Sequence, residues 1–354
     1  MIRDSYEFLR AMEEAPSPSG FEQPAQRIVR TRMKKYADSV TTDVHGNVIV
    51  ALNPKGKPRV MLAGHIDQIG LMVRYISDEG YLHFSAIGGI DPALLPGSRV
   101  TVWNRRKPVE GVIGRKPVHL MRGKEADQPK IEIPDLWIDI GAGSRADAEK
   151  RVAVGDPVTF KLGMSRLDGN VVVSPGFDNK VGVFCVMEAL RIASEKKLAC
   201  ALFAVSTVQE EIGLRGARTA CYGIDPLAGI AVDVTHASDY PTVEKKQVGD
   251  IRLGRGPVID VGANINPTLG ELFIRTARRR KIPYQMSGAP GATGTDANAI
   301  QISRAGVAAA LISIPNRYMH TPVELVSLDD LENCAKLIAE TVAQIDAKTD
   351  FVPR

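Results

Sequence analysis

The sequence lacks the features of secreted, membrane-spanning and nucleic-acid-binding proteins. No CxxC pair occurs among its four cysteines, which is typical of free buried thiols in a reducing compartment. No apolar run approaches the roughly 18 residues that span a membrane, and the first residues hold no apolar signal-peptide core. The net charge is only +4, and the basic block at residues 278–281 falls in a helical pattern. We therefore expect a cytoplasmic protein that binds neither nucleic acid nor membrane.

The sequence also lacks a phosphate-binding loop and any evident internal repeat. Its Gly-rich stretch at residues 288–296, GAPGATGTD, has no GK[ST] ending, so we expect a flexible loop there. Three histidines, His45, His83 and His119, come without an acid–histidine cluster and are expected to be turn, surface or packing residues.

The sequence has the composition of an ordinary globular protein, but the pattern of its apolar residues differs between two parts of the chain. Its 354 residues, 44% hydrophobic and 24% charged, suffice for more than one domain. Up to residue 69, and again from residue 163, apolar runs alternate with helical patterns, which predicts an α/β domain with a doubly wound sheet. Residues 70–162 instead hold short alternating runs separated by Gly, Pro, Asp and Asn, so we expect a small inserted β-rich module there.

The strongest local signal is an apolar run followed by two adjacent carboxylates. The run Ala201–Thr207 is typical of a parallel strand buried on both faces. Glu210 and Glu211 follow almost at once, and Gly213 then breaks the backbone. A solvated loop with two surface acids would explain this pair taken alone. Ligand sites in open α/β sheets, however, lie just past the carboxyl ends of such strands.

The same arrangement of an apolar run and a metal-ligand side chain occurs elsewhere in the chain. His65 and Asp67 follow the run at 60–63, Asp233 follows the run at 228–232, and His320 follows the run at 307–314. Asp178 opens a helical pattern and could simply cap that helix. Each signal is weak alone, but in a doubly wound sheet these strand ends share one edge.

Two histidines and four carboxylates at one sheet edge have the composition of a site for two bridged divalent ions. Imidazole together with carboxylate suits zinc, and also cobalt or manganese. Asp67 strengthens the candidate site, because metal-bound imidazoles usually donate their other N–H to an acceptor such as a carboxylate. The six candidate residues are His65, Asp178, Glu210, Glu211, Asp233 and His320.

Six segments together resemble the tetrahedral (TET) aminopeptidases. They are GHID at 64–67, PGFDNK at 175–180, VQEEIGLRGA at 208–217, DVTH at 233–236, GTDANAI at 294–300 and RYMHTPVE at 317–324. This family comprises cytosolic dinuclear metallo-aminopeptidases, including glutamyl and leucyl aminopeptidases, and some relatives carry an endoglucanase label. The resemblance runs from about residue 16 to the last helical pattern.

The resemblance implies a role for each candidate residue. Asp178 would bridge two metal ions, zinc or cobalt, while His65 and Asp233 complete one site. Glu211 and His320 would complete the other site. Glu210 would be the general base, and Asp67 would orient His65. Gln68 departs from the family pattern, in which many relatives have Glu, and this puts substrate preference or local hydrogen bonding in question rather than catalysis.

The resemblance also implies an architecture. Residues 1–69 and 163–354 would form a zinc-peptidase-like α/β catalytic domain with a mixed sheet. Residues 70–162 would form a small β-barrel-like dimerisation domain, from which dimers and a dodecameric tetrahedral shell are built. The implied activity is release of the N-terminal residue from small peptides, with a water activated between two metal ions.

Two readings from other classes stay open at this stage. A glycoside hydrolase would use paired carboxylates such as Glu210 and Glu211, but its mechanism has no need of His65, His320 or Asp233. A non-catalytic shell protein could keep the metal site for stability alone, but it has no use for a general base. We therefore favour the metallo-aminopeptidase.

Overall fold

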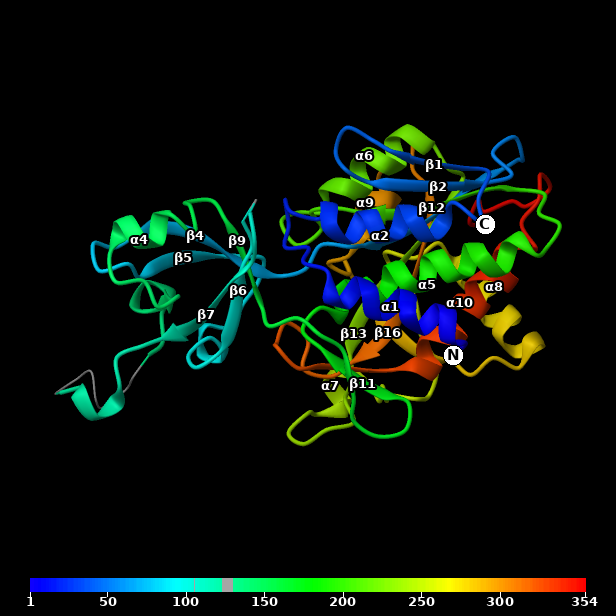
Figure 1. Cartoon of the computed structure of the whole chain (residues 1–354). Coiled ribbons are helices and arrows are strands. Elements are labelled where there is room, and N and C mark those ends of the chain that lie inside the picture. The colour runs from blue at the N-terminus through cyan, green and yellow to red at the C-terminus, as the bar shows by residue number, and fades with distance from the viewer. Residues whose placement is uncertain (105, 123–129) are drawn as a thin grey trace.

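An eight-stranded mixed sheet forms the centre of the larger part of the molecule (Figure 1). The computed structural model describes residues 1–104, 106–122 and 130–354. In spatial order the strands of this sheet are β1 (Ser39–Thr42), β2 (Val48–Leu52), β12 (Ala201–Thr207), β3 (Arg59–His65), β13 (Ala228–His236), β16 (Ala308–Asn316), β14 (Val258–Gly262) and β15 (Gln285–Ala289).

The four central strands, β12, β3, β13 and β16, are parallel, and antiparallel pairing begins at their flanks with β2 and β14. Their sequences are continuous apolar runs because helices cover both faces of the sheet. On one face lie α1 (Arg3–Glu14), α2 (Gln23–Met33), α5 (Phe177–Ser194), α8 (Pro267–Arg280) and α10 (Leu328–Val342). On the other lie α6 (Arg215–Ile224) and α9 (Asp296–Gln301), and the short α7 (Lys245–Val248) lies in the connection after β13.

A closed antiparallel barrel stands to one side of this sheet, on the left in Figure 1. Around the barrel the order is β4 (Gly70–Ile76), β5 (Leu82–Ile87), β8 (Trp137–Asp139), β7 (Val109–Gly114), β6 (Arg99–Val102) and β9 (Pro157–Phe160). It has its own buried core, which includes Val73, Leu82, Val100 and Ile138. Helix α4 (Arg145–Glu149) and the 3₁₀ turns η1 (Pro92–Leu94), η2 (Val118–Leu120) and η3 (Ile133–Asp135) lie between its strands.

A small three-stranded sheet connects the barrel to the main sheet. It consists of β10 (Ser165–Arg166), β11 (Val171–Ser174) and β17 (Glu324–Ser327), all antiparallel. Strand β11 leads directly into α5, and β17 leads directly into α10. This sheet therefore places the start of α5 next to the end of the loop that follows β16.

The predicted fold class, a doubly wound mixed sheet with an inserted barrel-like unit, is confirmed. The strand predicted at Ala201–Thr207 is found with those bounds. Strands β8, β10, β14, β15 and β17 were not predicted, and β15 occupies the start of the expected loop at 288–296. Residues 105 and 123–129 of the predicted inserted module lie outside the described residues. Within the described residues, no helix combines the length and apolar character needed to cross a membrane.

Candidate metal centre

Five chain segments bring the predicted site residues to one edge of the large sheet. His65 ends β3, Glu210 and Glu211 follow β12, Asp178 lies in the first turn of α5, Asp233 lies in β13, and His320 follows β16. The expectation that Asp233 follows the end of its strand is wrong. Strand β13 continues to His236, because its last residues still pair with β16.

Gly64 allows α5 to lie close enough to β3 for this convergence. A Cβ atom added to Gly64 would lie 2.6 Å from the carbonyl carbon of Gly182, a distance that side chains do not tolerate. The helix backbone therefore passes directly beside the residue that precedes His65. This close approach brings the start of α5, and with it Asp178, to the end of β3.

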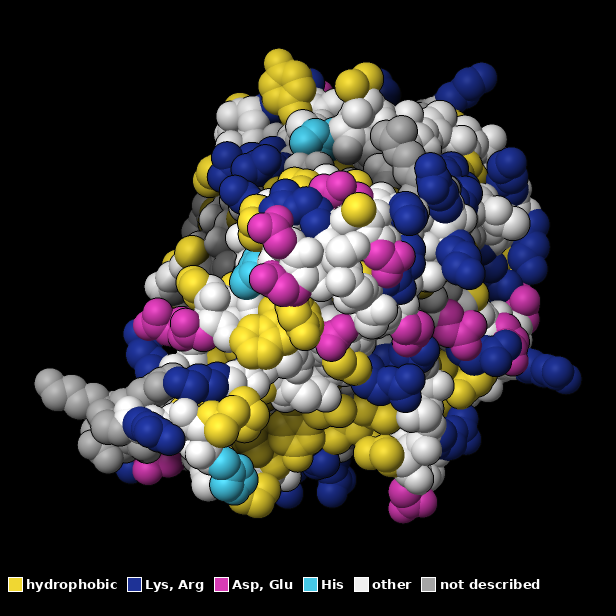
Figure 2. All heavy atoms as spheres, turned by 60° about the vertical axis from the view of Figure 1, so that its left-hand side comes forward, with side chains coloured by type: hydrophobic (Ala, Val, Ile, Leu, Met, Phe, Trp, Pro, Cys, Tyr) yellow, Lys and Arg dark blue, Asp and Glu magenta, His cyan; other side chains and the backbone are white. Residues whose placement is uncertain are grey.

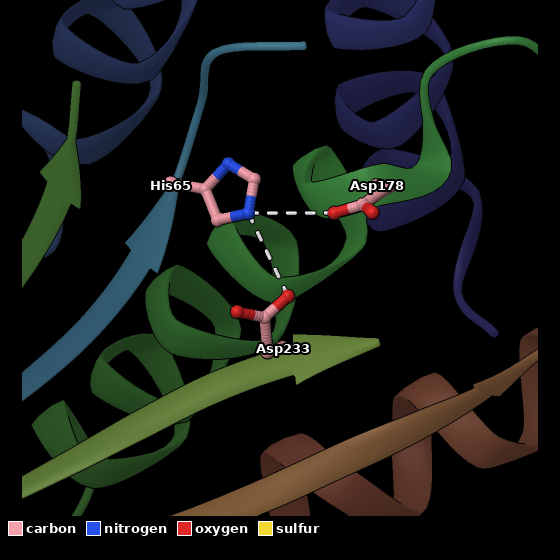
Figure 3. Close-up of side chains that lie close together, drawn as sticks. All are labelled: His65, Asp178 and Asp233. Atoms are coloured by element: carbon pink, nitrogen blue, oxygen red, sulfur yellow. Dashed lines mark ion pairs between the residues drawn. The ribbon is translucent and has the colours of Figure 1, made fainter. Parts of the chain in front are cut away.

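His65 and two carboxylates form the first half of the cluster, and Figure 3 shows them pointing toward one another. Nε2 of His65 lies 3.3 Å from Oδ1 of Asp178 and 3.6 Å from Oδ1 of Asp233. The same nitrogen lies 3.8 Å from Oε2 of Glu210. All of these side chains except Glu210 belong to buried residues, so their charges interact with little screening by water.

His320 forms the second half of the cluster around the other oxygen of Asp178. Its Nε2 lies 3.1 Å from Oδ2 of Asp178 and 3.5 Å from Oε1 of Glu211. Asp178 thus offers one carboxylate oxygen to each histidine. Within each half, the potential ligand atoms all lie within 4.8 Å of one another.

Asp67 contacts two of the site segments and the loop before α2, although not in the predicted way. Nδ1 of His65 faces the backbone carbonyl of Asp67 at 3.0 Å, whereas the nearest carboxylate oxygen of Asp67 is 3.6 Å away. The carboxylate instead accepts hydrogen bonds from the backbone N–H groups of Glu210 and Glu211, at 3.0 and 3.2 Å, and from the Ser19 hydroxyl at 2.7 Å. Asp67 therefore fixes the imidazole through its backbone and the two glutamates through its side chain.

Gln68, the departure from the family pattern, is buried beside the cluster rather than in it. Its Oε1 accepts a hydrogen bond from the Ser17 hydroxyl at 3.2 Å, and its backbone N–H donates to the carbonyl of Ser17. Gln68 is not among the described residues that line the pocket. Its position links the loop before α2 to the chain between β3 and β4.

The excess of carboxylates controls the charge of both histidines. Burial disfavours the charged form of His65, but the surrounding carboxylates, Glu210 foremost, raise its pKa well above the usual range. The contacts with Asp178 and Glu211 outweigh burial at His320 and raise its pKa to about 11. Burial, reinforced by neighbouring acids, raises the pKa of Glu210 to about 9. The cluster as a whole therefore attracts positive charge.

The donor set fits a pair of divalent cations. Mixed imidazole and carboxylate ligands are those of zinc, cobalt and manganese sites. Oε1 of Glu211 is buried and finds no hydrogen-bond donor among the described residues, so this ligand atom is available. No Lys or Arg of the described chain lines the pocket to neutralise the acids. Buried carboxylates at this density require a positive partner, and two cations sharing Asp178 would supply it.

A pocket of about 580 Å³ opens over the cluster. Besides the acids and His65 and His320, its described lining holds no Asp, Glu, Lys or Arg and comes from several loops. It includes Leu214 after β12, Thr235 and His236 at the end of β13, Thr293 before α9, and Met319 beside His320. The barrel also reaches the pocket, because Gly89, just after β5, lines it.

Two buried acids beside the cluster were not predicted from the sequence. Glu324 accepts hydrogen bonds from the backbone N–H groups of Asp178 and His320, at 2.8 and 2.9 Å. Asp296 accepts a hydrogen bond from the Thr207 hydroxyl at 2.6 Å, and burial raises its pKa to about 7. Both acids lie in segments that carried the family resemblance, GTDANAI and RYMHTPVE, which was the only sequence signal for them.

The fold and the cluster together define a class of protein. A doubly wound mixed sheet with a histidine and carboxylate cluster at its edge, and a barrel beside it, is the architecture expected of zinc-peptidase-like enzymes. The comparisons with known proteins identify the family. A model of the M42 glutamyl aminopeptidases matches residues 46–337, so the chain belongs to this family and is a peptide hydrolase.

Individual relatives agree with this membership over nearly the whole chain. The lysyl aminopeptidase of Pyrococcus furiosus is 39% identical over 350 residues, 98% of this chain and 99% of the relative. The TET aminopeptidase of a marine-sediment Thaumarchaeota archaeon superposes with a TM-score of 0.93 at 36% identity, covering 98% of this chain and 97% of that one.

Two further solved structures resemble the chain and carry different descriptions. The Pyrococcus horikoshii TET1 peptidase, which is described as assembling into a tetrahedron or a large octahedral shell, has a TM-score of 0.85 at 33% identity, covering 96% and 100% of the two chains. A Thermotoga maritima protein described as an endoglucanase has a TM-score of 0.76 at 29% identity, covering 95% and 96%. The predicted resemblance to the TET aminopeptidases, including the endoglucanase label of some relatives, is thereby confirmed.

Proposed function

We propose that this protein is a dinuclear metal-dependent aminopeptidase that releases the N-terminal residue from small peptides. The observation that carries the proposal is the position of Asp178, whose two carboxylate oxygens lie 3.3 and 3.1 Å from Nε2 of His65 and of His320. A shared carboxylate between two histidines, each with a further acid beside it, is the arrangement that two bridged cations require.

Each residue has a role in this proposal. His65, Asp233 and one oxygen of Asp178 would hold one metal ion. Glu211, His320 and the other oxygen of Asp178 would hold the second, with zinc or cobalt as the ion. Asp67 is a positioning residue, since it contacts His65 through its carbonyl and the backbone of both glutamates through its carboxylate.

Glu210 is the general base in this proposal. When bound, a pair of divalent ions supplies Lewis acidity, which lowers the pKa of a water and polarises the scissile carbonyl. The Glu210 carboxylate takes the proton of that water as its oxygen attacks the carbonyl carbon, and then gives the proton to the leaving amine nitrogen. Its side chain is only 10% exposed, which protects this proton transfer from bulk solvent.

The substrate must present a free N-terminal amine. Four carboxylates line the pocket, Asp178, Glu210, Glu211 and Asp233, and they attract an ammonium group. This restricts cleavage to the first peptide bond.

We further propose that residues 70–162 form an assembly domain, through which the protein builds dimers and a dodecameric shell. The support is the tetrahedral assembly of the similar TET1 peptidase. The face turned forward in Figure 2 carries a hollowed band of hydrophobic side chains in its lower part. Exposed hydrophobic residues of this segment include Tyr75, Tyr81, Val112, Val118, Leu120 and Val154.

Metal removal and restoration is the decisive test of the proposed activity. The protein would be dialysed against a chelator and assayed with aminoacyl anilides before and after adding zinc or cobalt. We expect activity to disappear with the metal and to return with it. Anilide hydrolysis that persists in fully metal-free protein would contradict the proposal.

The endoglucanase description of one structural neighbour justifies one parallel assay. A glycoside hydrolase needs two carboxyl groups across a sugar bond and no metal. The same metal-free and metal-restored samples would therefore be incubated with a β-glucan. Release of sugar that is independent of metal would favour the glycosidase over the aminopeptidase.

A further inference from the structure

Glu324 lies where the two chain segments that carry Asp178 and His320 run side by side. Strand β17 begins at Glu324 and pairs antiparallel with β11, with Glu324 opposite Ser174. Strand β11 continues into the first turn of α5 and hence to Asp178. On the other side, the loop that carries His320 leads into β17.

The Glu324 side chain joins these two segments by hydrogen bonds to their backbones. Oε2 accepts from the N–H of Asp178 at 2.8 Å, and Oε1 accepts from the N–H of His320 at 2.9 Å. The residue is only 1% exposed, so water does not compete for these bonds. Because one oxygen serves each segment, the carboxylate fixes the distance between the two ligand-bearing backbones.

The loop that carries His320 needs such an anchor. Its backbone adopts positive φ angles at Tyr318 (64°) and His320 (60°), a conformation that non-glycine residues rarely adopt unless surrounding contacts hold it. Arg317 and Leu325 pair through both of their backbone N–H groups at 3.0 Å and close the base of the loop. The bond from His320 N–H to Glu324 then fixes its tip.

Two further buried charged residues, Glu13 and Lys180, interact electrostatically with Glu324. Glu13 accepts a hydrogen bond from the Ser174 hydroxyl at 2.7 Å, and Lys180 donates to the carbonyl of Ala15 at 2.8 Å. Lys180 is fully buried and is attracted to both Glu13 and Glu324. The positive charge of Lys180 reduces the large free-energy cost of burying these two acids.

We propose that Glu324 is a positioning residue that sets the geometry of the metal centre through the backbones of Asp178 and His320. It binds no metal itself. Its carboxylate holds the backbones of Asp178 and His320 at a fixed separation. Oδ2 of Asp178 and Nε2 of His320 therefore lie 3.1 Å apart. This inference rests on the proposed metal centre, and it predicts that Glu324 controls metal affinity chiefly at the half of the site formed by His320.

The test is metal titration of the Glu324→Gln variant by calorimetry, starting from chelator-treated protein and using Zn²⁺ or Co²⁺. Glutamine keeps the shape but has a single acceptor oxygen, so one of the two backbone N–H groups loses its partner. We expect one metal equivalent to bind nearly as in the wild type and the other about 10–100-fold more weakly, the usual effect of losing a ligand-orienting partner. Glu324→Asp, which retracts the carboxylate by one methylene group, should show the same loss of affinity for one metal equivalent. If Glu324→Gln does not fold, the metal titration of Glu324→Asp tests the proposal instead.

Asp330→Asn provides a matched control. Asp330 is a fully buried carboxylate that also accepts two backbone N–H groups, from Gly254 and Gly256 at 2.7 Å each, but it is not among the described residues of the pocket. This variant should lose thermal stability while binding both metal equivalents like the wild type. Wild-type affinity in a folded Glu324 variant, or an equal loss in Asp330→Asn, would overturn the proposal. A wild-type protein that binds no metal would instead overturn the proposed metal centre itself.

Discussion

The two adjacent glutamates should respond differently to the same isosteric substitution. Both Glu210→Gln and Glu211→Gln keep side-chain shape, and Asp67 continues to hold both backbone N–H groups, at 3.0 and 3.2 Å. Each variant therefore tests a side chain without displacing the loop. The Glu210 side chain lies beside His65 and the Glu211 side chain beside His320, so a common role is not expected.

Glu210→Gln should lose rate and keep metal. Its Oε2 lies 3.8 Å from Nε2 of His65, and Glu210 belongs to neither of the two groups of mutually close ligand atoms, as expected of a base beside the metal pair rather than a ligand. Removing the proton acceptor should lower the turnover number by about 10²–10⁴-fold, which corresponds to about 3–5 kcal/mol in the activation free energy.

Glu211→Gln should lose metal. Its Oε1 lies 3.5 Å from Nε2 of His320 and is one of three potential ligand atoms of that half of the cluster. An amide in place of an anionic ligand weakens this half, and excess zinc or cobalt should restore part of the activity. Glu195→Gln, at an exposed position that pairs with Arg191 at 3.4 Å, is the control and should change neither property.

Metal content by atomic emission, measured beside the turnover number of each variant, decides the assignment. If Glu210→Gln loses metal and Glu211→Gln does not, the two roles are reversed. If both variants keep wild-type activity, the pair is an ordinary surface loop and the proposed mechanism is wrong.

Three further predictions concern substrate charge, pH and assembly. Because no Lys or Arg of the described residues lines the pocket, kcat/KM for a glutamyl anilide should be about tenfold or more below that for a leucyl anilide; comparable values would contradict this. The pKa of His320 is about 11 in the metal-free cluster and that of His65 is also raised, so metal must displace protons at neutral pH. Affinity should therefore rise between pH 6 and 8, by about tenfold per pH unit for each displaced proton, and calorimetry that finds no pH dependence would refute this. Deleting residues 70–162 and bridging the gap with a short linker should leave metal binding intact but abolish large assemblies; a dodecamer that survives in light scattering would show that assembly resides elsewhere.

The central strands could be predicted because burial on both faces leaves a plain apolar signature. This is why Ala201–Thr207 was predicted with its observed bounds and why the ends of β3 and β16 pointed to His65 and His320. The strands beyond the central parallel four, toward β15, do not carry this signature. Strand β14 contains the buried Asp260, whose carboxylate accepts a hydrogen bond from the Ser313 hydroxyl at 2.6 Å, a partner that only the folded sheet supplies.

The candidate site shows the same division between local and long-range information. The residue types and their positions after strands indicated the ligand set, because strand ends in a doubly wound sheet share an edge. The contacts of Asp67 with the loop after β12, and of Glu324 with α5, depend on pairings across 140 or more residues of chain. The spacing of residues along the sequence does not show which distant segments pair, so the sequence does not indicate the role of Glu324, although Glu324 lies in the RYMHTPVE segment.

The closure of the barrel between β4 and β9 has a consequence for folding kinetics. Leu71 in β4 lies opposite Val158 in β9, so the chain enters and leaves the barrel at neighbouring points. The parallel pairing of β3 with β12 and β13 must bring together segments on either side of the barrel. A barrel that forms first would shorten the loop between β3 and β12 from ~135 residues to ~50, saving about 1 kcal/mol of chain entropy. We therefore expect the barrel, whose β4–β5 and β6–β7 pairings are local, to fold ahead of the central sheet and to accelerate its nucleation.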